Sequence, residues 1–408
     1  MARIAVVGSG ISGLTAAYKL SNLHEVHLLE KNCKLGGHTD THRVEIDGTV
    51  VNVDSGFIVH NDRTYPEFQK ILAELGCQTS PTEMSFSVKK HGLEYKGRSL
   101  NTLFAQRGNL VSISFLRMVR DIIKFNKRAT RGIENNLEKT IGEYLDEENY
   151  SWEFKNNYLL PMAGAIWSTG KEPIKSFPLG AFLSFFQNHG LLQLRNRPKW
   201  MVIDGGSETY INEMTKKISE IFLECEVTGI KRTTENVTLR TKSFVHDYDR
   251  VIIATHSDQA LKLLENPTEQ EAEILGSMKY SSNKVIVHTD ERLMPERKLA
   301  WASWNYNLNA NEEKASLTYY MNLLQNLEVD RSIFVTLNDS DTIDPSKILA
   351  RREYEHPFYD SGMIASQKRH HEITGQNRTH FVGAYWGNGF HEDGVTSAIK
   401  AFKEIESS

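Results

Sequence analysis

The chain has 408 residues, and at about 150 residues per domain this length predicts two or three structural regions. Its 48 Lys and Arg residues are balanced by 52 Asp and Glu residues, so the net charge is −4 and no nucleic-acid partner is expected. Hydrophobic residues make up 39% of the chain, which is enough for a large core and excludes a disordered or fibrous protein.

Cysteine usage and the start of the chain indicate the compartment. The three cysteines, Cys33, Cys77 and Cys225, include no CxxC pair, which argues against a disulfide framework and against a structural zinc site. No leader pattern precedes the first predicted strand, and no apolar run reaches the roughly 18 residues that a spanning helix needs. We therefore expect no metal site and a cytoplasmic protein, with contact at the inner face of the membrane left open.

The first 30 residues predict a βαβ unit that binds a dinucleotide. Residues 4–7 and 26–29 are apolar runs typical of strands, and a GxGxxG turn over residues 8–13 joins the first strand to a helical pattern. In such a turn the first glycine permits the bend, the second lets a pyrophosphate approach the backbone, and the third brings helix and strand together. Glu30 stands twenty residues after Gly10, where a carboxylate can accept hydrogen bonds from a ribose diol. A structural turn with a surface glutamate is the alternative interpretation.

Residues 103–200 differ from the rest of the chain. Their long apolar and aromatic segments end at prolines or glycines, which predicts a helical cap. Residues 280–320 alternate apolar and polar side chains, which predicts a mostly antiparallel sheet. The other predicted elements resume the nucleotide-binding pattern: a helix that ends at Gly76, a helix over 210–221, strands over 225–230, 251–254 and 381–385, a hairpin near 237–241 and a final helix from Val395.

Six further segments carry motifs that accompany the GxGxxG turn in one superfamily. They are Leu35-Gly36-Gly37-His38, Val53-Asp54-Ser55-Gly56-Phe57-Ile58-Val59-His60, Asp204-Gly205-Gly206-Ser207, Asp249-Arg250-Val251-Ile252-Ile253-Ala254-Thr255-His256, Phe381-Val382-Gly383-Ala384 and Gly389-Phe390-His391-Glu392-Asp393-Gly394-Val395. In this order they resemble the motifs of the flavin-containing amine oxidase and phytoene desaturase superfamily, and Val227 falls where a strand of that superfamily contacts adenine. The resemblance implies FAD as the cofactor.

The turn and the resemblance together assign FAD binding to residues in several parts of the chain: Gly8, Gly10, Ile11, Ser12, Gly13, Glu30, Lys31, Gly36, Gly37, His38, Gly56, Phe57, Ile58, Val59, Val227, Ala254, Thr255, His391, Glu392, Gly394 and Val395. In the last motif, a helix start near Gly394 and Val395 is expected to stabilise the negative charge of a reduced flavin. His391 and Glu392 either touch the cofactor or cap that helix, and Asp393 is the expected N-cap.

The resemblance also implies the fold class. We expect an α/β, amine-oxidase-like protein in which a discontinuous Rossmann-type FAD-binding domain carries an inserted α+β substrate domain. The FAD-binding domain is expected over residues 1–80, 201–265 and 375–408. The substrate domain, with its helical cap, is expected over residues 81–200 and 266–374.

Two candidate catalytic residues lie on the predicted strand around residue 286. Lys284 resembles the lysine that holds a water near flavin N5 in amine oxidase relatives, and a solvated strand lysine is the equal alternative. His288 can form a proton-handling pair with Asp290, although a purely structural pair is the favoured interpretation. Several aromatic side chains either line a site that faces the flavin or belong to the core: Trp301, Trp304, Tyr306, Tyr319 and Tyr320.

The end of the chain suggests a substrate class. The sequence Gly-Phe-His-Glu-Asp-Gly most resembles a bacterial subgroup similar to the N-terminal flavoprotein-like half of plant cyclopropane fatty acid synthases, which implies chemistry on unsaturated or methylated acyl chains. A basic stretch over 117–131 can contact anionic lipid, or can be a solvated face. An apolar series can line a lipid tunnel or belong to the core: Phe177, Leu179, Phe182, Leu183, Phe185 and Phe186.

Three functions remain open from the sequence. The first is an FAD-dependent oxidoreductase that transfers hydride to flavin N5 from a fatty acyl chain, in a desaturation or an isomerisation. The second is an amine oxidase, which predicts two aromatic side chains flanking the flavin and a nearby lysine. The third is a non-catalytic FAD-binding partner of a lipid-modifying methyltransferase. The fold alone cannot choose among them, and the sequence is silent on the electron acceptor and the oligomeric state.

Overall fold

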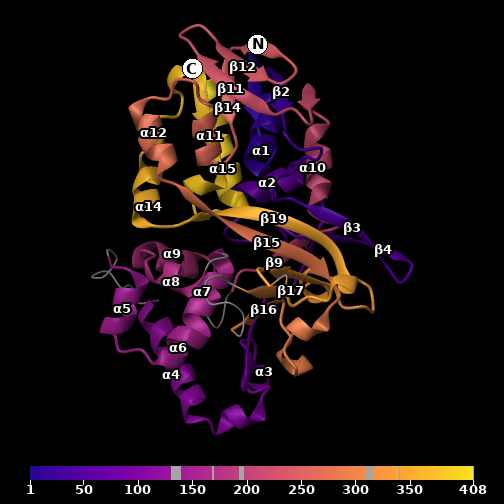
Figure 1. Cartoon of the computed structure of the whole chain (residues 1–408), viewed down its shortest axis with the longest axis vertical. Helices are drawn as coiled ribbons and strands as arrows, with labels where there is room; N and C mark the ends of the chain where they lie inside the picture. Colours follow the sequence, from indigo (N-terminus) through magenta and orange to yellow (C-terminus); the bar gives the residue numbers. More distant parts are fainter. Residues whose placement is uncertain (130–138, 168–169, 193–196, 309–315, 340, 408) are drawn as a thin grey trace.

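A five-stranded parallel sheet forms the upper part of the molecule in Figure 1, a computed structural model that describes residues 1–129, 139–167, 170–192, 197–308, 316–339 and 341–407. Its strand order is β10-β2-β1-β14-β20. The strands come from distant parts of the chain: β1 Arg3–Val7, β2 Glu25–Leu29, β10 Glu220–Phe222, β14 Arg250–Ile253 and β20 Thr379–Phe381. The sheet has the architecture expected of a Rossmann-type domain.

The central strands of this sheet are apolar on both faces because both faces are covered. One face packs against four helices: α1 Ile11–Leu20, α2 Pro66–Leu75, α10 Glu208–Thr215 and α15 His391–Glu406. The other face packs against a three-stranded meander and two helices: β11 Val227–Arg232, β12 Val237–Thr241, β13 Val245–Tyr248, α11 Ser257–Leu263 and α12 Glu269–Gly276. Such double coverage explains why β1, β2 and β14 read as continuous apolar runs.

A seven-stranded mixed sheet lies below the parallel sheet and has the order β19-β15-β18-β17-β16-β7-β8. Its strands are β7 Phe86–Lys90, β8 Leu93–Lys96, β15 Lys279–His288, β16 Trp304–Asn307, β17 Leu317–Tyr320, β18 Phe334–Leu337 and β19 Ile348–Phe358. All neighbours pair antiparallel except β7 and β16, which pair parallel. The long pair β15 and β19 crosses the molecule between its upper and lower parts (Figure 1).

The helical cap occupies the lower left of Figure 1. It contains α3 Leu100–Leu103, the short 3-10 helix η1 Arg107–Leu110, α4 Ile113–Ala129, α5 Ile141–Glu147, α6 Trp152–Phe154, α7 Leu160–Trp167, α8 Lys171–Lys175 and α9 Leu179–Asn188. Its core is rich in aromatic side chains, including the fully buried Phe154, Phe182 and Phe186. Among the described residues, no helix is both long enough and apolar enough to cross a bilayer.

Smaller elements link the two sheets. They are the hairpin β3 Thr41–Ile46 with β4 Thr49–Asp54, the three-stranded sheet of β5 His60–Asn61, β9 Trp200–Ile203 and β6 Thr79–Pro81, and the helices α13 Met321–Leu324 and α14 Ser361–Lys368. The β5-β9-β6 sheet joins segments on either side of the cap, because β5 and β6 precede the cap in sequence and β9 follows it.

Three predicted element boundaries differ from the structure. The helix predicted over 210–221 ends at Thr215, since residues 220–222 instead form β10 at the edge of the parallel sheet. The last helix begins at His391 and not at Val395, because the Asp393 carboxylate accepts the backbone N–H of Phe390 at 2.9 Å and fixes an earlier start. Helix α12 packs into the core of the parallel sheet, although residue 266 was the predicted start of the substrate domain.

Candidate functional site

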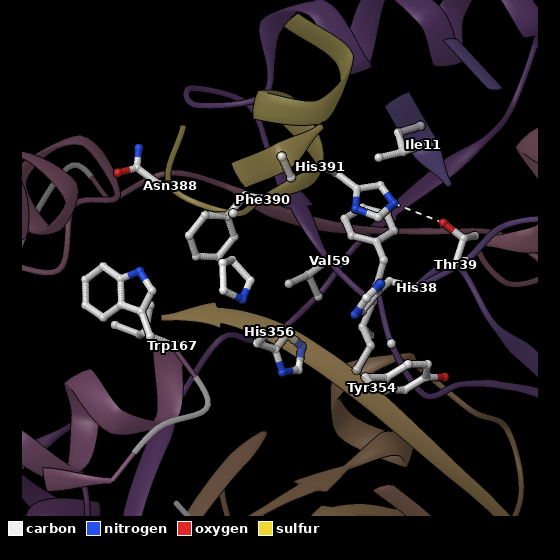
Figure 2. A pocket seen from close by; sticks show the side chains of 18 of the residues that line it. Ile11, His38, Thr39, Val59, Trp167, Tyr354, His356, Asn388, Phe390 and His391 are labelled. Carbon is white, nitrogen blue, oxygen red and sulfur yellow. Dashed lines mark hydrogen bonds between the residues drawn. The ribbon is translucent and has the colours of Figure 1, made fainter. Parts of the chain in front are cut away.

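A cavity of about 1770 Å³ runs from the carboxyl ends of the parallel strands to the helical cap. The ends of β1, β2 and β14 contribute Gly8, Glu30 and Ala254 to its wall. In open parallel sheets, ligands bind at this edge. Figure 2 shows a close view of the wall, where side chains from α15, β19, the cap and the loop around His38 converge.

The GxGxxG turn has the geometry that a pyrophosphate requires. Gly8 has a φ of +99°, which favours glycine, and a β-carbon placed on Gly10 would meet no atom within 4 Å. A β-carbon on Gly13 would overlap the carbonyl oxygen of Gly8, so this glycine brings α1 close to β1 and does not itself line the cavity. Helix α1 has no side-chain cap, which leaves its first backbone N–H groups for an anion.

Glu30 is buried, with 6% of its surface exposed, and lines the cavity. One carboxylate oxygen accepts the backbone N–H and the hydroxyl of Ser9 at 3.0 and 2.6 Å, and the other accepts the backbone and side-chain N–H of Asn32 at 2.9 and 2.8 Å. These four bonds fill the acceptor capacity of a carboxylate. A ribose hydroxyl that binds Glu30 must therefore replace one of them.

A second loop, around Gly36, Gly37 and His38, closes over the GxGxxG turn. The Gly36 N–H donates to the carbonyl of Ser9 at 3.1 Å. The His38 carbonyl accepts the Phe57 N–H at 2.8 Å, and a β-carbon on Gly56 would overlap this carbonyl. The GxGxxG turn, the loop around His38 and the segment at Gly56 thus form one continuous wall. Gly56 is required where its backbone meets the His38 carbonyl.

His391 occupies the start of α15, where the last motif meets the cavity. Its Nε2 lies 3.0 Å from the Thr39 hydroxyl (Figure 2) and 3.1 Å from the Tyr210 hydroxyl. Its ring stacks on Phe57 at a centroid distance of 3.5 Å, and burial holds the pKa of His391 well below the usual value. Because this imidazole is neutral, the backbone N–H groups at the start of α15 are the main source of positive potential at this wall.

Four residues of the last motif do not line the cavity: Glu392, Asp393, Gly394 and Val395. The Glu392 carboxylate accepts the backbone N–H groups of Glu67 and Phe68, each at 3.0 Å, and so caps the start of α2. A β-carbon on Gly394 would lie 2.7 Å from the Ser12 hydroxyl, which shows that Gly394 permits close packing of α15 on α1. Val395 is fully buried in the same interface. The cofactor-binding predictions for Glu392, Gly394 and Val395 are therefore corrected to structural roles.

Asp54 joins two of the motifs. Its carboxylate accepts the backbone N–H of Ser207 at 3.0 Å, the Ser207 hydroxyl at 2.9 Å and the Thr41 hydroxyl at 2.5 Å. The side-chain amide of Gln325 also donates to it at 3.0 Å. Burial raises the pKa of Asp54 to about 6. Asp54 thus ties the start of α10 to the β3-β4 hairpin and to the residue that follows α13.

Imidazole and phenol side chains form the wall below the flavin-binding loops. The ring of His38 lies 5.0 Å from that of Tyr354 and 5.3 Å from that of His356, centroid to centroid (Figure 2). Burial, then the neighbouring His256, lowers the pKa of His38 to about 4, and burial, then His38, lowers that of His356 to about 3. Both imidazoles are neutral at pH 7.

The helical cap contributes only uncharged side chains to the cavity from its described residues, and we call the part of the cavity that they line the cap arm. Its lining residues between positions 100 and 191 are Leu100, Leu103, Val119, Ile122, Ile123, Asn126, Tyr158, Met162, Ile166, Trp167, Phe185, His189, Gly190 and Leu191. Burial lowers the pKa of His189 to about 4, so this imidazole is neutral. Across the described residues of this span, the wall holds no lysine, arginine, aspartate or glutamate.

The structure does not bring the two candidate catalytic residues into the site. Lys284 is exposed and lies outside the cavity wall. His288 is fully buried, with its Nε2 2.8 Å from the Thr336 hydroxyl and its Nδ1 accepting the Asp290 N–H at 3.0 Å. Asp290 is instead paired with Arg292. Neither side chain lines the cavity, so the geometry gives no support to either catalytic assignment.

The aromatic and apolar predictions divide between wall and core. Trp304 and Tyr319 line the cavity, while Trp301, Tyr306 and Tyr320 do not. Of the apolar series, Phe185 lines the cap arm, and the others pack in the cap core: Phe177, Leu179, Phe182, Leu183 and Phe186. Arg131, the last residue of the predicted basic stretch, lies outside the described residues.

The remaining predicted FAD-binding residues fit the cofactor. They all line the cavity: Gly8, Gly10, Ile11, Ser12, Glu30, Lys31, Gly36, Gly37, His38, Gly56, Phe57, Ile58, Val59, Val227, Ala254, Thr255 and His391. Within the described part of the chain, the buried wall atoms His38 Nε2, Tyr359 OH and Tyr385 OH have no hydrogen-bond partner, as expected of atoms that face a polar ligand. The sequence did not identify Ser9, Thr39, Tyr354 or His356 as wall residues.

The site has open space beside Gly10, a buried acid after β2 and a helix start at the far wall. These features define a flavoprotein of the Rossmann type, with FAD as cofactor. The chain belongs to the flavin containing amine oxidoreductase family, whose model matches residues 11–350. It is an FAD-dependent oxidoreductase, so the non-catalytic interpretation is set aside.

Curated relatives include oxidases of amino acids. The chain is 23% identical to an L-amino-acid oxidase of Pseudechis australis over 99% of its own length and 86% of the relative. It spans 58% of an L-amino-acid oxidase of Notechis scutatus scutatus, at 26% identity over 71% of this chain. It therefore spans less than two thirds of the length of some relatives that it matches.

Solved structures share the fold at low identity. A putrescine oxidase mutant superposes with a TM-score of 0.72 at 17% identity, covering 100% of this chain and 99% of the other. A CLA-producing fatty acid isomerase from P. acnes superposes with a TM-score of 0.70 at 13% identity, covering 99% of this chain and 98% of the other. The same fold thus serves amine and fatty acid chemistry, and the site must distinguish them.

Proposed function

We propose that this oxidoreductase acts on an unsaturated or methylated fatty acyl chain, which it desaturates or isomerises. The observation that carries this proposal is the uncharged wall of the cap arm. Each buried CH₂ group of an acyl chain gains about 0.8 kcal/mol in such an environment, whereas an unpaired charged group costs several kcal/mol. The arm therefore favours a long apolar substrate over a charged one.

Bound FAD would supply the two-electron acceptor for this chemistry. The protein's own contribution is to position the substrate. Met162, Ile166 and Trp167 form one side of the arm, and no charged group in its described wall can select a carbon by electrostatics. The carbon that reacts is then set by how far the chain reaches along the arm. The neutral imidazoles of His38 and His356 also line the cavity, and because Nδ1 of His356 accepts the side-chain N–H of Asn283 at 2.9 Å, its Nε2 carries the proton and is a donor.

Amine oxidation is the second candidate. The family membership, the L-amino-acid oxidases among the relatives and the aromatic wall residues Trp304 and Tyr319 favour it. The exposed position of Lys284 speaks against it, because the amine hypothesis requires a lysine beside the flavin.

Anaerobic mixing of the FAD-loaded chain with each substrate class distinguishes the two candidates. A desaturated acyl chain leaves its hydride on the flavin and is expected to bleach the flavin absorbance, whereas an isomerised chain takes the hydride back and is expected to appear as a positional isomer without lasting bleaching. Primary amines, L-amino acids and diamines are expected to give neither signal. Bleaching by an amine alone would replace the acyl proposal with the amine one. The absence of both bleaching and a rearranged acyl product would remove the support for both.

A variant pair links the activity to the arm. Ile166→Asp places a carboxylate in the wall and is expected to slow acyl-dependent bleaching at least 100-fold, which corresponds to about 2.7 kcal/mol. Ile166→Leu, the matched control, preserves apolar volume and is expected to stay near the wild-type rate. Both variants should retain FAD, since Ile166 lies on the cap and not at the GxGxxG turn.

A further inference from the structure

The lower end of the molecule in Figure 1, opposite the two chain termini, is formed by α3, η1 and the start of α4. Of thirteen large apolar side chains that are exposed among the described residues, six fall between positions 100 and 123. We call these six the apical patch: Leu100, Leu110, Val111, Ile113, Leu116 and Ile123. Single exposed apolar residues are ordinary, whereas a group on one end of a molecule marks an interaction surface.

The patch exists because α4 has more apolar side chains than the core accepts. Phe115, Met118 and Phe125 face inward and are almost fully buried. Ile113, Leu116 and Ile123 lie at other positions of the same helix and remain outside, with 75%, 43% and 60% of their surfaces exposed. An ordinary surface helix would carry polar residues at these positions.

Two residues of the patch also line the cavity. Leu100 and Ile123 line the cap arm, yet 76% and 60% of their surfaces are exposed. Side chains that both line a cavity and face outward mark a mouth, a place where the cavity opens. At this mouth the apolar side chains share the wall with the polar residues Arg98, Ser99 and Asn126.

The residues beside the patch carry more cations than anions. Residues 98–128 contain seven arginines and lysines and a single acid, Asp121. Ion pairs engage part of this charge: Arg98 with Glu83, Arg117 with Glu153, Arg120 with Asp121, and Lys124 and Arg128 with Glu148. The excess of cations over anions is complementary to an anionic surface, and cations near such a surface each add about 1 kcal/mol of attraction.

We propose that the apical patch docks on an anionic phospholipid bilayer, so that an acyl chain passes from the bilayer through the mouth between Leu100 and Ile123 into the cap arm. Val111 and Ile113 enter the headgroup boundary, while Arg117 and its basic neighbours stay at headgroup level. The identity of the cargo rests on the proposed function, and the docking itself rests on the patch, the mouth and the charge.

Vesicle flotation of the full FAD-loaded chain tests the docking. Wild type is expected to float with phosphatidylcholine vesicles that contain phosphatidylglycerol, and more weakly with phosphatidylcholine alone. The double variant Val111→Asp with Ile113→Asp is expected to lose at least ten-fold in partitioning. Arg117→Gln is expected to lose about five-fold, the equivalent of about 1 kcal/mol, and only with anionic vesicles.

Val245→Asp is the matched control. Val245 is 60% exposed on β13, which belongs to the meander beside the parallel sheet, and its substitution should leave flotation unchanged. FAD content and melting temperature identify any variant that fails to fold. Wild type that floats with no vesicle, or a double variant that floats like wild type, would overturn the proposal. So would self-association that the double variant abolishes in the absence of vesicle binding.

Different results would contradict the docking and the proposed function. If wild type floats but no acyl substrate is desaturated or isomerised, the patch is a membrane surface and the acyl chemistry is wrong. If fatty acid delivered from cyclodextrin bleaches the flavin of a chain that binds no vesicle, the acyl chemistry stands and the docking is wrong.

Discussion

The two ends of the cavity are built in opposite ways. At the flavin end, polar groups are held by short hydrogen bonds, and backbone segments approach so closely that Gly13 and Gly56 have no room for a β-carbon. At the cap end, apolar side chains make the wall, and shape replaces hydrogen bonding. A fixed cofactor needs the first kind of wall, and a long flexible substrate is accommodated by the second. Each of the following predictions tests this contrast.

The largest effect is expected at Gly13. A valine there would overlap the Gly8 carbonyl and separate α1 from β1, so Gly13→Val should yield no folded, FAD-loaded protein. Gly10→Ala has open space around its new methyl group and should fold, but that space is the one expected to hold the pyrophosphate. Thermal melting and flavin content measure both. Gly108→Ala, on the cap with no atom within 4 Å, should change neither.

Glu30→Ala is expected to weaken FAD binding about 100-fold, or about 2.7 kcal/mol. It removes the acceptor for the ribose and leaves the buried Ser9 N–H without its partner. Glu30→Gln keeps one acceptor oxygen and should lose less. Titration of the apoprotein with FAD measures the dissociation constants, and equal affinity of Glu30→Ala and wild type would show that this carboxylate only supports the turn.

His60 is expected to contribute to instability in acid. It is 1% exposed, and burial lowers its pKa to about 4, below the usual 6.5. The folded state therefore binds fewer protons than the unfolded state between these values, so stability is lost as the pH falls through this range. The loss between pH 7 and pH 5 should be about 2 kcal/mol, and His60→Phe should remove it from the pH dependence of the unfolding free energy.

The control for this prediction is the exposed His246, whose replacement by phenylalanine should leave the pH dependence parallel to that of wild type. Asp54 and Asp393 act in the opposite sense, because burial raises the pKa of each to about 6. Their stabilising effect grows as the pH falls, and it cancels in the difference between wild type and His60→Phe.

The smallest effect is expected from a substitution that shortens the cap arm. Met162→Trp adds volume to its wall and should disfavour the longest acyl chains about ten-fold while leaving shorter ones unaffected. Rates of anaerobic flavin bleaching across a chain-length series measure this. Uniform slowing at all lengths would indicate that Met162 does not set the depth of the arm.

The sequence predicted the flavin end well because its determinants are local. A glycine turn and an acid after the second strand have fixed spacings, and both line the cavity as expected. The cap end was predicted only as apolar and helical. Phe185 faces the cavity while Phe186 faces the core, and only the packing of α9 distinguishes them.

The wrong predictions have physical causes. Side chains alternate between the two faces of a strand, so a shift of one residue reverses the direction in which each side chain points. On β15, Asn283 is buried and Lys284 is exposed, which a lysine motif alone cannot reveal. The sequence did not predict Thr39, Tyr354 and His356 as wall residues. The loop around His38, which contains Thr39, and the distant strand β19 meet only in the folded chain.

The strand order of the parallel sheet brings widely separated parts of the chain into one site. The edge strand β20 and the helix α15, which carries His391 into the cavity wall, follow the GxGxxG turn by more than 350 residues. A truncation before β20 would therefore remove one side of the cofactor cradle, although it would leave the GxGxxG turn and Glu30 untouched.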